Sequence, residues 1–120
     1  INKNVWDPNG HSEFLCSGNM ILQESRWKEI TRRIFEGMAC GKLVITDRLP
    51  QKTNIDSLLI ENKDIIYYDS VEELAQKISY YEENKEERSK IASNGRQKVL
   101  KNHTQIQWVD KIIEKWKNYQ

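Results

Sequence analysis

A four-residue apolar run, residues 43–46 (LVIT), directly follows a helix-like segment, and this combination restricts the possible folds. The run is rich in β-branched residues and lacks polar alternation, which is typical of a strand covered on both faces. The preceding segment, residues 29–40, carries Ile34 and Met38 on one helical face and ends before Gly41, where a helix-terminating glycine belongs. A strand covered on both faces and entered from a helix predicts a parallel sheet flanked by helices.

Two further strands and three further helices complete this prediction. The strands are expected at 20–24, 43–46 and 64–68, and the helices near 29–40, 71–82, 85–101 and 105–117. Residues 1–10 indicate a loop, 11–17 a short helix and 55–60 one or two helical turns. The fold class is α/β: a Rossmann-like half domain with a sheet of three or slightly more parallel strands, flanking helices and a helical C-terminal tail.

Polar residues mark where the later helices begin. Ser70 with Glu73, and Asn84 with Glu87, have the spacing of a capping box, and Thr104 opens the last helix. The faces expected to be buried follow at helical spacing: Leu74, Ile78 and Tyr81 in the first of these helices, and Ile91, Gly95 and Val99 in the second. The last helix carries an apolar face of Val109, Ile112, Ile113 and Trp116 that could lie in the core or contact another domain.

Composition limits the size of the unit and its partners. With 120 residues, 38% of them hydrophobic and 31% charged, the chain is one domain with a thin core that we expect to rest on a neighbouring domain. It starts at Ile1 rather than Met, which suggests a piece of a longer protein. A net charge of +1 argues against nucleic-acid binding, and no apolar run approaches the length of a membrane span. Cys16 and Cys40 lack the spacing of a zinc site, and as free thiols they would fit a cytoplasmic location.

The most informative candidate site follows the first strand. Arg26, Lys28, Arg32 and Arg33 stand against Glu29 alone, and they lead into a helix N-terminus. Free amides, the helix dipole and basic side chains together favour a phosphate. A solvated basic face is the competing interpretation.

Two residues further along the same helix extend this candidate site. Glu36 has the two acceptor oxygens that suit a ribose diol, although it could equally be an exposed helix residue. Gly37 weakens the helix, so we expect a packing or ligand reason for it. Arg33 could face a phosphate or pair with Glu36 one turn later.

Residues 33–47 (RIFEGMACGKLVITD) resemble the "R-x-FEAMACG-x-x-V-x-T-D" signature of group 1 glycosyltransferases with the GT-B fold. Similar pieces follow in the family's order at 55–59, 68–74, 87–95 and 103–104, and they resemble the spore-maturation-type branch. The resemblance covers residues 13–117 and implies that residues 1–120 form the C-terminal, donor-binding domain of a two-domain enzyme. The N-terminal domain, which would carry the acceptor site, is then a partner outside this chain.

The resemblance also implies roles for individual residues. Glu36 stands where the family has the glutamate that contacts the donor ribose, and Ser25 stands where it has a serine after the strand. The helix start at Thr31, Arg32 and Arg33 corresponds to the pyrophosphate site. The expected donor-binding set also includes Arg26, Lys28 and Gly37. Many relatives have a second glutamate eight positions before the first, where this chain has Lys28, with Glu29 one residue off.

The implied function is transfer of a sugar from a nucleotide-diphosphate sugar, without metal or other cofactor, by a hexosyltransferase-like enzyme that is inactive as this fragment alone. The resemblance assigns no catalytic residue within the chain. Lys28 favours the alternative, a non-catalytic Rossmann-like binding or interaction module.

Overall fold

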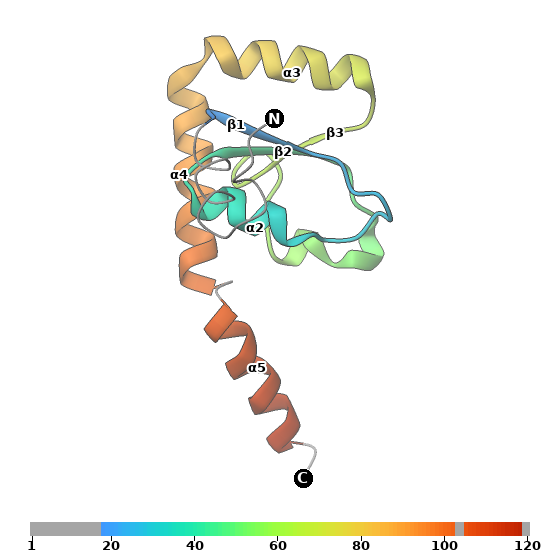
Figure 1. Ribbon diagram of the computed structural model, residues 1–120, viewed down its shortest axis with the longest axis vertical. Helices are drawn as coiled ribbons and strands as arrows, with labels where there is room; N and C mark the ends of the chain where they lie inside the picture. Colours follow the sequence, from blue (N-terminus) through green and yellow to red (C-terminus); the bar gives the residue numbers. More distant parts are fainter. Residues whose placement is uncertain (1–17, 103–104, 119–120) are drawn as a thin grey trace, which may run out of the picture.

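The computed structural model describes residues 18–102 and 105–118 and contains a three-stranded parallel sheet (Figure 1). Strands β1 (Met20–Gln23), β2 (Leu43–Asp47) and β3 (Ile66–Tyr68) lie in the order β1-β2-β3. Met20 pairs with Leu43 across the first interface, and Ile45 pairs with Ile66 across the second. The predicted fold class and the three adjacent parallel strands are therefore confirmed.

Helices cover both faces of the sheet, as Figure 1 shows. Helix α2 (Arg32–Ala39) lies on one face, α3 (Val71–Glu83) on the other, and α4 (Lys85–Asn102) runs beside the sheet and contacts both helices. Two short 3-10 turns, η2 (Gln51–Thr53) and η3 (Ile55–Ser57), connect β2 toward β3. Within the described part of the chain, no helix is both long and apolar enough to cross a membrane.

The two faces of β2 build two separate core layers. Val44 packs in the layer beneath α2, whereas Leu43 and Ile45 pack in the layer beneath α3. Every residue of β2 is buried, so this strand is the one covered on both faces, as the LVIT run predicted.

The predicted inner faces of α3 and α4 are confirmed. Tyr81 of α3 and Ile91 of α4 lie in the core layer on the α3 side, and Val99 of α4 lies in the other. Gly95 is buried at a close contact, since a Cβ there would lie 2.8 Å from the Asp64 carbonyl oxygen. Helix α4 is thus held against both layers along most of its length.

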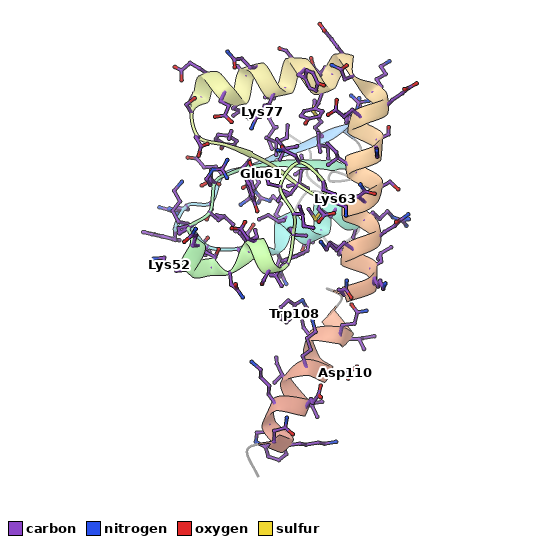
Figure 2. The ribbon with its side chains drawn as sticks, turned by 180° about the vertical axis from the view of Figure 1, so that it is seen from behind. Lys52, Glu61, Lys63, Lys77, Trp108 and Asp110 are labelled. Atoms are coloured by element: carbon purple, nitrogen blue, oxygen red, sulfur yellow. The ribbon has the colours of Figure 1, made fainter. Side chains whose placement is uncertain are left out.

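Helix α5 (Gln105–Asn118) continues beyond α4 and projects away from the sheet, and Trp108 and Asp110 are labelled on it in Figure 2. Its predicted apolar face is exposed: the exposed fractions of Ile112 and Trp116 are 64% and 61%. The helix itself is confirmed, and its apolar face stays largely exposed among the described residues. Helical periodicity identifies an apolar face and does not identify what covers it.

Two of the expected capping boxes can be compared with the structure. The Glu73 amide donates to Ser70 Oγ at 3.1 Å, and the Glu73 carboxylate accepts from the Asp69 amide rather than from Ser70. Asn84 does not act as predicted, because its side-chain amide donates to the Tyr80 carbonyl at the end of α3. The expected cap at Thr104, the helix at 11–17 and the loop at 1–10 lie outside the described residues.

Cys40 also departs from the sequence prediction. It packs half-buried against the core as expected, but it is disulfide-bonded rather than free. The expectation of free thiols is therefore wrong at Cys40, and it no longer supports a reducing compartment. Cys16 lies outside the described residues.

Candidate functional site

A hollow of about 360 Å³ opens where β1 ends and α2 begins. In an open parallel sheet, ligands bind at this carboxyl edge, beside the helix N-termini. Five residues of the predicted donor site line the hollow, together with three residues outside the predicted donor-binding set. The first group is Arg26, Thr31, Arg32, Arg33 and Glu36, and the second is Gln23, Glu24 and Glu29.

Ser25 organises the loop between β1 and α2, which lines part of this hollow. Its hydroxyl accepts from the Glu29 amide at 2.7 Å and donates to the Glu29 carbonyl at 2.9 Å, so it closes a tight loop on itself. Its own amide donates to Asp47 Oδ1 at 2.8 Å, which ties the loop to the end of β2. The structure thus places Ser25 in a buried position where it organises the loop and does not line the hollow.

Lys28 also holds the loop. Its backbone has a φ of 54°, in the left-handed region, and its ammonium lies 2.6 Å from Asp47 Oδ2. This hydrogen bond raises the pKa of Lys28 above its ordinary value. Burial raises the pKa of Asp47, but the hydrogen bonds from Lys28, Ser25 and Thr46 outweigh it, so the pKa of Asp47 lies below its ordinary value. Both groups are therefore charged at neutral pH.

The turn at Lys28 decides which side chain reaches the hollow. Lys28 is directed toward Asp47, and the next residue, Glu29, lines the hollow together with Glu36. The loop thus presents a carboxylate from position 29 where the resemblance led us to expect one from position 28.

The N-terminus of α2 opens into the same hollow. Thr31 is the N-cap residue, in extended conformation, but its hydroxyl makes no capping hydrogen bond to the helix. The Ile34 amide donates to the Thr31 carbonyl at 3.3 Å, which leaves the amides of Arg32 and Arg33 to other acceptors. An anion in the hollow would meet both these amides and the positive end of the helix dipole.

Arg32 and Arg33 lie on the exposed side of this first turn. Arg32 Nε is 3.9 Å from Glu36 Oε1, which is beyond hydrogen-bond distance, and the Arg32 side chain is 90% exposed. Among the described residues Arg33 makes no ion pair, so the pairing with Glu36 considered from the sequence falls to Arg32 instead. Arg33 lines the hollow and is positioned to contact a ligand there.

Buried acceptor oxygens collect in this hollow. Four buried side-chain oxygens in the described part of the chain lack a hydrogen-bond partner, and three of them belong to Gln23, Glu29 and Thr31. Gln23 is only 4% exposed. A buried acceptor without a partner costs about 1–3 kcal/mol, so the polar groups with the least satisfied hydrogen bonding in the described chain lie around this hollow.

The sequence reasoning missed Gln23 and gave Glu29 only a minor role. Gln23 is the last residue of β1, and a polar side chain at the carboxyl end of a strand is a signal that could have identified it. The position of the Glu29 side chain depends on the backbone conformation of Lys28, which cannot be predicted from residue spacing.

Gly37 serves the packing of α2 and not the hollow. A Cβ at Gly37 would lie 2.6 Å from Ile21 Cδ1 and 3.1 Å from Val44 Cγ2, so any larger residue would have to move the Ile21 side chain. The packing reason expected for this glycine is therefore present. Among the described residues, no group of three or more His, Cys, Asp and Glu side chains could hold a metal ion.

The fold and the hollow define an α/β domain with a mixed acidic and basic ligand site at the carboxyl edge of its sheet. The chain belongs to the glycosyl transferase-like family, whose pattern it matches over residues 2–114. No significant match was found among curated proteins or among solved structures. The family supports glycosyl transfer in general terms.

Proposed function

We propose that this chain is the donor-binding domain of a group 1 GT-B glycosyltransferase of the spore-maturation type, and that its hollow binds a nucleotide-diphosphate sugar. The observation that carries the proposal is the combination, in one hollow, of a helix N-terminus, three arginines and a set of acceptor oxygens without partners. The helix N-terminus and the arginines suit a diphosphate, and the acceptor oxygens suit the hydroxyls of a ribose and a sugar.

The diphosphate is assigned to the first turn of α2. Arg33 and Arg26 are exposed on the hollow, and Arg32 is held only by a 3.9 Å approach to Glu36. Arginine guanidinium groups bind phosphate oxygens in pairs of hydrogen bonds, and the helix amides add further donors. These groups would stabilise the charge that develops on the leaving diphosphate, so the proposed transfer needs no metal.

The ribose and the sugar are assigned to the acceptors. Glu36 lies one turn into α2 with a side chain 37% exposed, within reach of a diol whose diphosphate sits at the helix start. Gln23, Glu29 and Thr31 line the same hollow, and we assign the donor sugar's hydroxyls to these polar side chains.

Glu29 bears on the alternative, a non-catalytic binding module. That alternative was favoured by a lysine at position 28, where relatives have a glutamate. Because Glu29 brings a carboxylate to the hollow while Lys28 binds Asp47, the lysine no longer argues against a donor site. A cytoplasmic location and an acceptor site on a separate N-terminal domain are parts of the proposal that rest on the resemblance.

A titration with nucleoside diphosphates, followed by amide chemical shifts, tests the proposal. Binding should be weak, in about the millimolar range, because half a cleft leaves most of the ligand in water. The shifts should map to residues 23–36 and spare α3 and α5. Shifts confined to another surface would contradict the proposal. We also expect no glycosyl transfer by this chain alone, and turnover above spontaneous hydrolysis would show that the catalytic groups are misplaced.

A further inference from the structure

A second hollow, of about 310 Å³, lies at the opposite end of the sheet. It opens beside the residues that precede β1 and β2, whereas the donor hollow lies where β1 ends. Strands of four or five residues separate the two ends by roughly 15 Å. The two hollows share no lining residue.

The charge of this second hollow is one-sided. Lys42, Arg88 and Arg96 line it, and none of its lining residues is acidic. The donor hollow, by contrast, balances three arginines with three glutamates. An excess of positive charge in a concave site raises the local concentration of anions.

Two of the three cations are held in place by the fold. Arg88 Nη1 donates to the Tyr81 carbonyl at 3.1 Å, and Arg96 Nε donates to the Ala39 carbonyl at 3.1 Å. Gly41 has a φ of 74°, and a Cβ there would lie 3.4 Å from Arg96 Cδ, so the glycine leaves room for the arginine. Each guanidinium keeps further N–H donors, because a guanidinium has five.

The structural role of these arginines does not account for the whole site. Binding the last carbonyls of α3 and α2 is a common use of arginine, and it explains one hydrogen bond of each. It explains neither Lys42, which forms no ion pair among the described residues, nor the hydroxyls of Ser89 and Ser93 on the same side of α4. Lysine, arginine and serine side chains are together the donor set of a phosphate site.

We propose that this hollow binds the phosphoryl group of a small phosphorylated ligand, independently of the donor site. Lys42 and the two arginines neutralise the charge, and Ser89 and Ser93 donate hydrogen bonds to its oxygens. The volume admits a phosphate with a small organic group attached. The inference does not depend on the proposed function, because it uses other residues at the other end of the sheet.

The test is a titration of the protein with inorganic phosphate at constant ionic strength, followed by amide chemical shifts, with chloride as the reference anion. We expect saturable shifts at Gly41, Lys42, Ser89 and Ser93 that chloride does not produce. Lys42→Gln should weaken this binding about 5-fold, as expected for one charge-assisted contact at a partly exposed site.

The matched control is Lys90→Gln, which removes an exposed lysine of α4 that does not line the hollow. It should leave the affinity unchanged, and Lys42→Gln should leave any phosphate shifts at residues 31–36 unchanged. If Lys42→Gln does not fold, Ser93→Ala serves in its place with an expected loss of about 2- to 3-fold. Shifts that do not saturate, an equal response to chloride, or an equal loss in Lys90→Gln would overturn the proposal.

Discussion

The two sides of the eight-residue helix α2 differ in role: one packs against the sheet, and the other lines the hollow. The side that faces the sheet is closed: Ile34 and Met38 are 0% and 1% exposed, and a Cβ at Gly37 would lie 2.6 Å from Ile21 Cδ1. The side that faces the hollow carries Arg32, Arg33 and Glu36, all of them at least partly exposed. Stability is therefore concentrated on one side and the proposed ligand contacts on the other, so the two can be changed separately.

The largest effect is expected on the closed side, from Ile34→Ala. Removing a fully buried side chain from a packed layer should lower the free energy of unfolding by about 3 kcal/mol. The neighbouring change on the open side, Arg33→Ala, should alter it by less than about 0.5 kcal/mol. Urea denaturation of both variants makes the comparison. Equal losses would show that the two sides are not separate.

A smaller effect is expected from Gly37→Val, because the added side chain must displace Ile21 and Val44. Overpacking of this kind should lower the free energy of unfolding by about 2 kcal/mol. Gly18→Ala is the matched control, since a Cβ there meets only the Met20 carbonyl oxygen at 3.4 Å. Urea denaturation should find the control within about 0.5 kcal/mol of the parent protein. A Gly37→Val protein as stable as the control would place the reason for this glycine elsewhere.

The sheet and the closed side of α2 could be predicted because their signals are local. The LVIT run, the spacing of Ile34 and Met38 and the position of Gly41 each follow from periodicity or from backbone geometry, and the structure confirms them. The bounds were less accurate: α2 begins at Arg32 rather than near residue 29. The Ser25 hydroxyl bonds the backbone of Glu29 and keeps that stretch as a loop, and such a bond leaves no mark in hydrophobic spacing.

The open side could be predicted only in part. The arginines and Glu36 came from charge and from the family signature, and five predicted residues do line one hollow. Gln23 and Glu29 were not assigned to it, since their positions depend on where β1 stops and on the left-handed turn at Lys28. The exposed face of α5 was not predicted either, because covering an apolar face takes a second surface that periodicity does not describe.

Asp47 ties the loop before α2 to the end of β2, and its contribution to stability should depend on pH. Its pKa is lowered in the folded protein, so the stability it provides is fully present above its ordinary pKa and is lost as the pH falls through the lower, folded value. Acid titration should therefore release the Ser25 amide, whose chemical shift should change at a pH below 3.8. Asp47→Asn should abolish this transition. A Ser25 shift that follows the ordinary pKa of aspartate would contradict the assignment.

The smallest effect is expected from Arg33→Ala, on the salt dependence of the affinity for a nucleoside diphosphate. If Arg33 contacts the diphosphate, Arg33→Ala should bind a nucleoside diphosphate with a shallower loss of affinity as salt increases, because one cation fewer is neutralised. Titrations at several salt concentrations measure this slope. Identical slopes in the two proteins would assign the phosphate contact to Arg26 or Arg32.

The affinity of the protein for a nucleoside diphosphate, measured by titration calorimetry with and without Glu36→Ala, shows whether the open side of α2 is a donor site. We expect the substitution to weaken binding by about 1–3 kcal/mol, the value of hydrogen bonds to a charged group. Glu114→Ala, on the projecting helix α5, is the matched control and should bind as the parent does. Unchanged affinity in Glu36→Ala, or an equal loss in both variants, would contradict a donor site on the open side of α2.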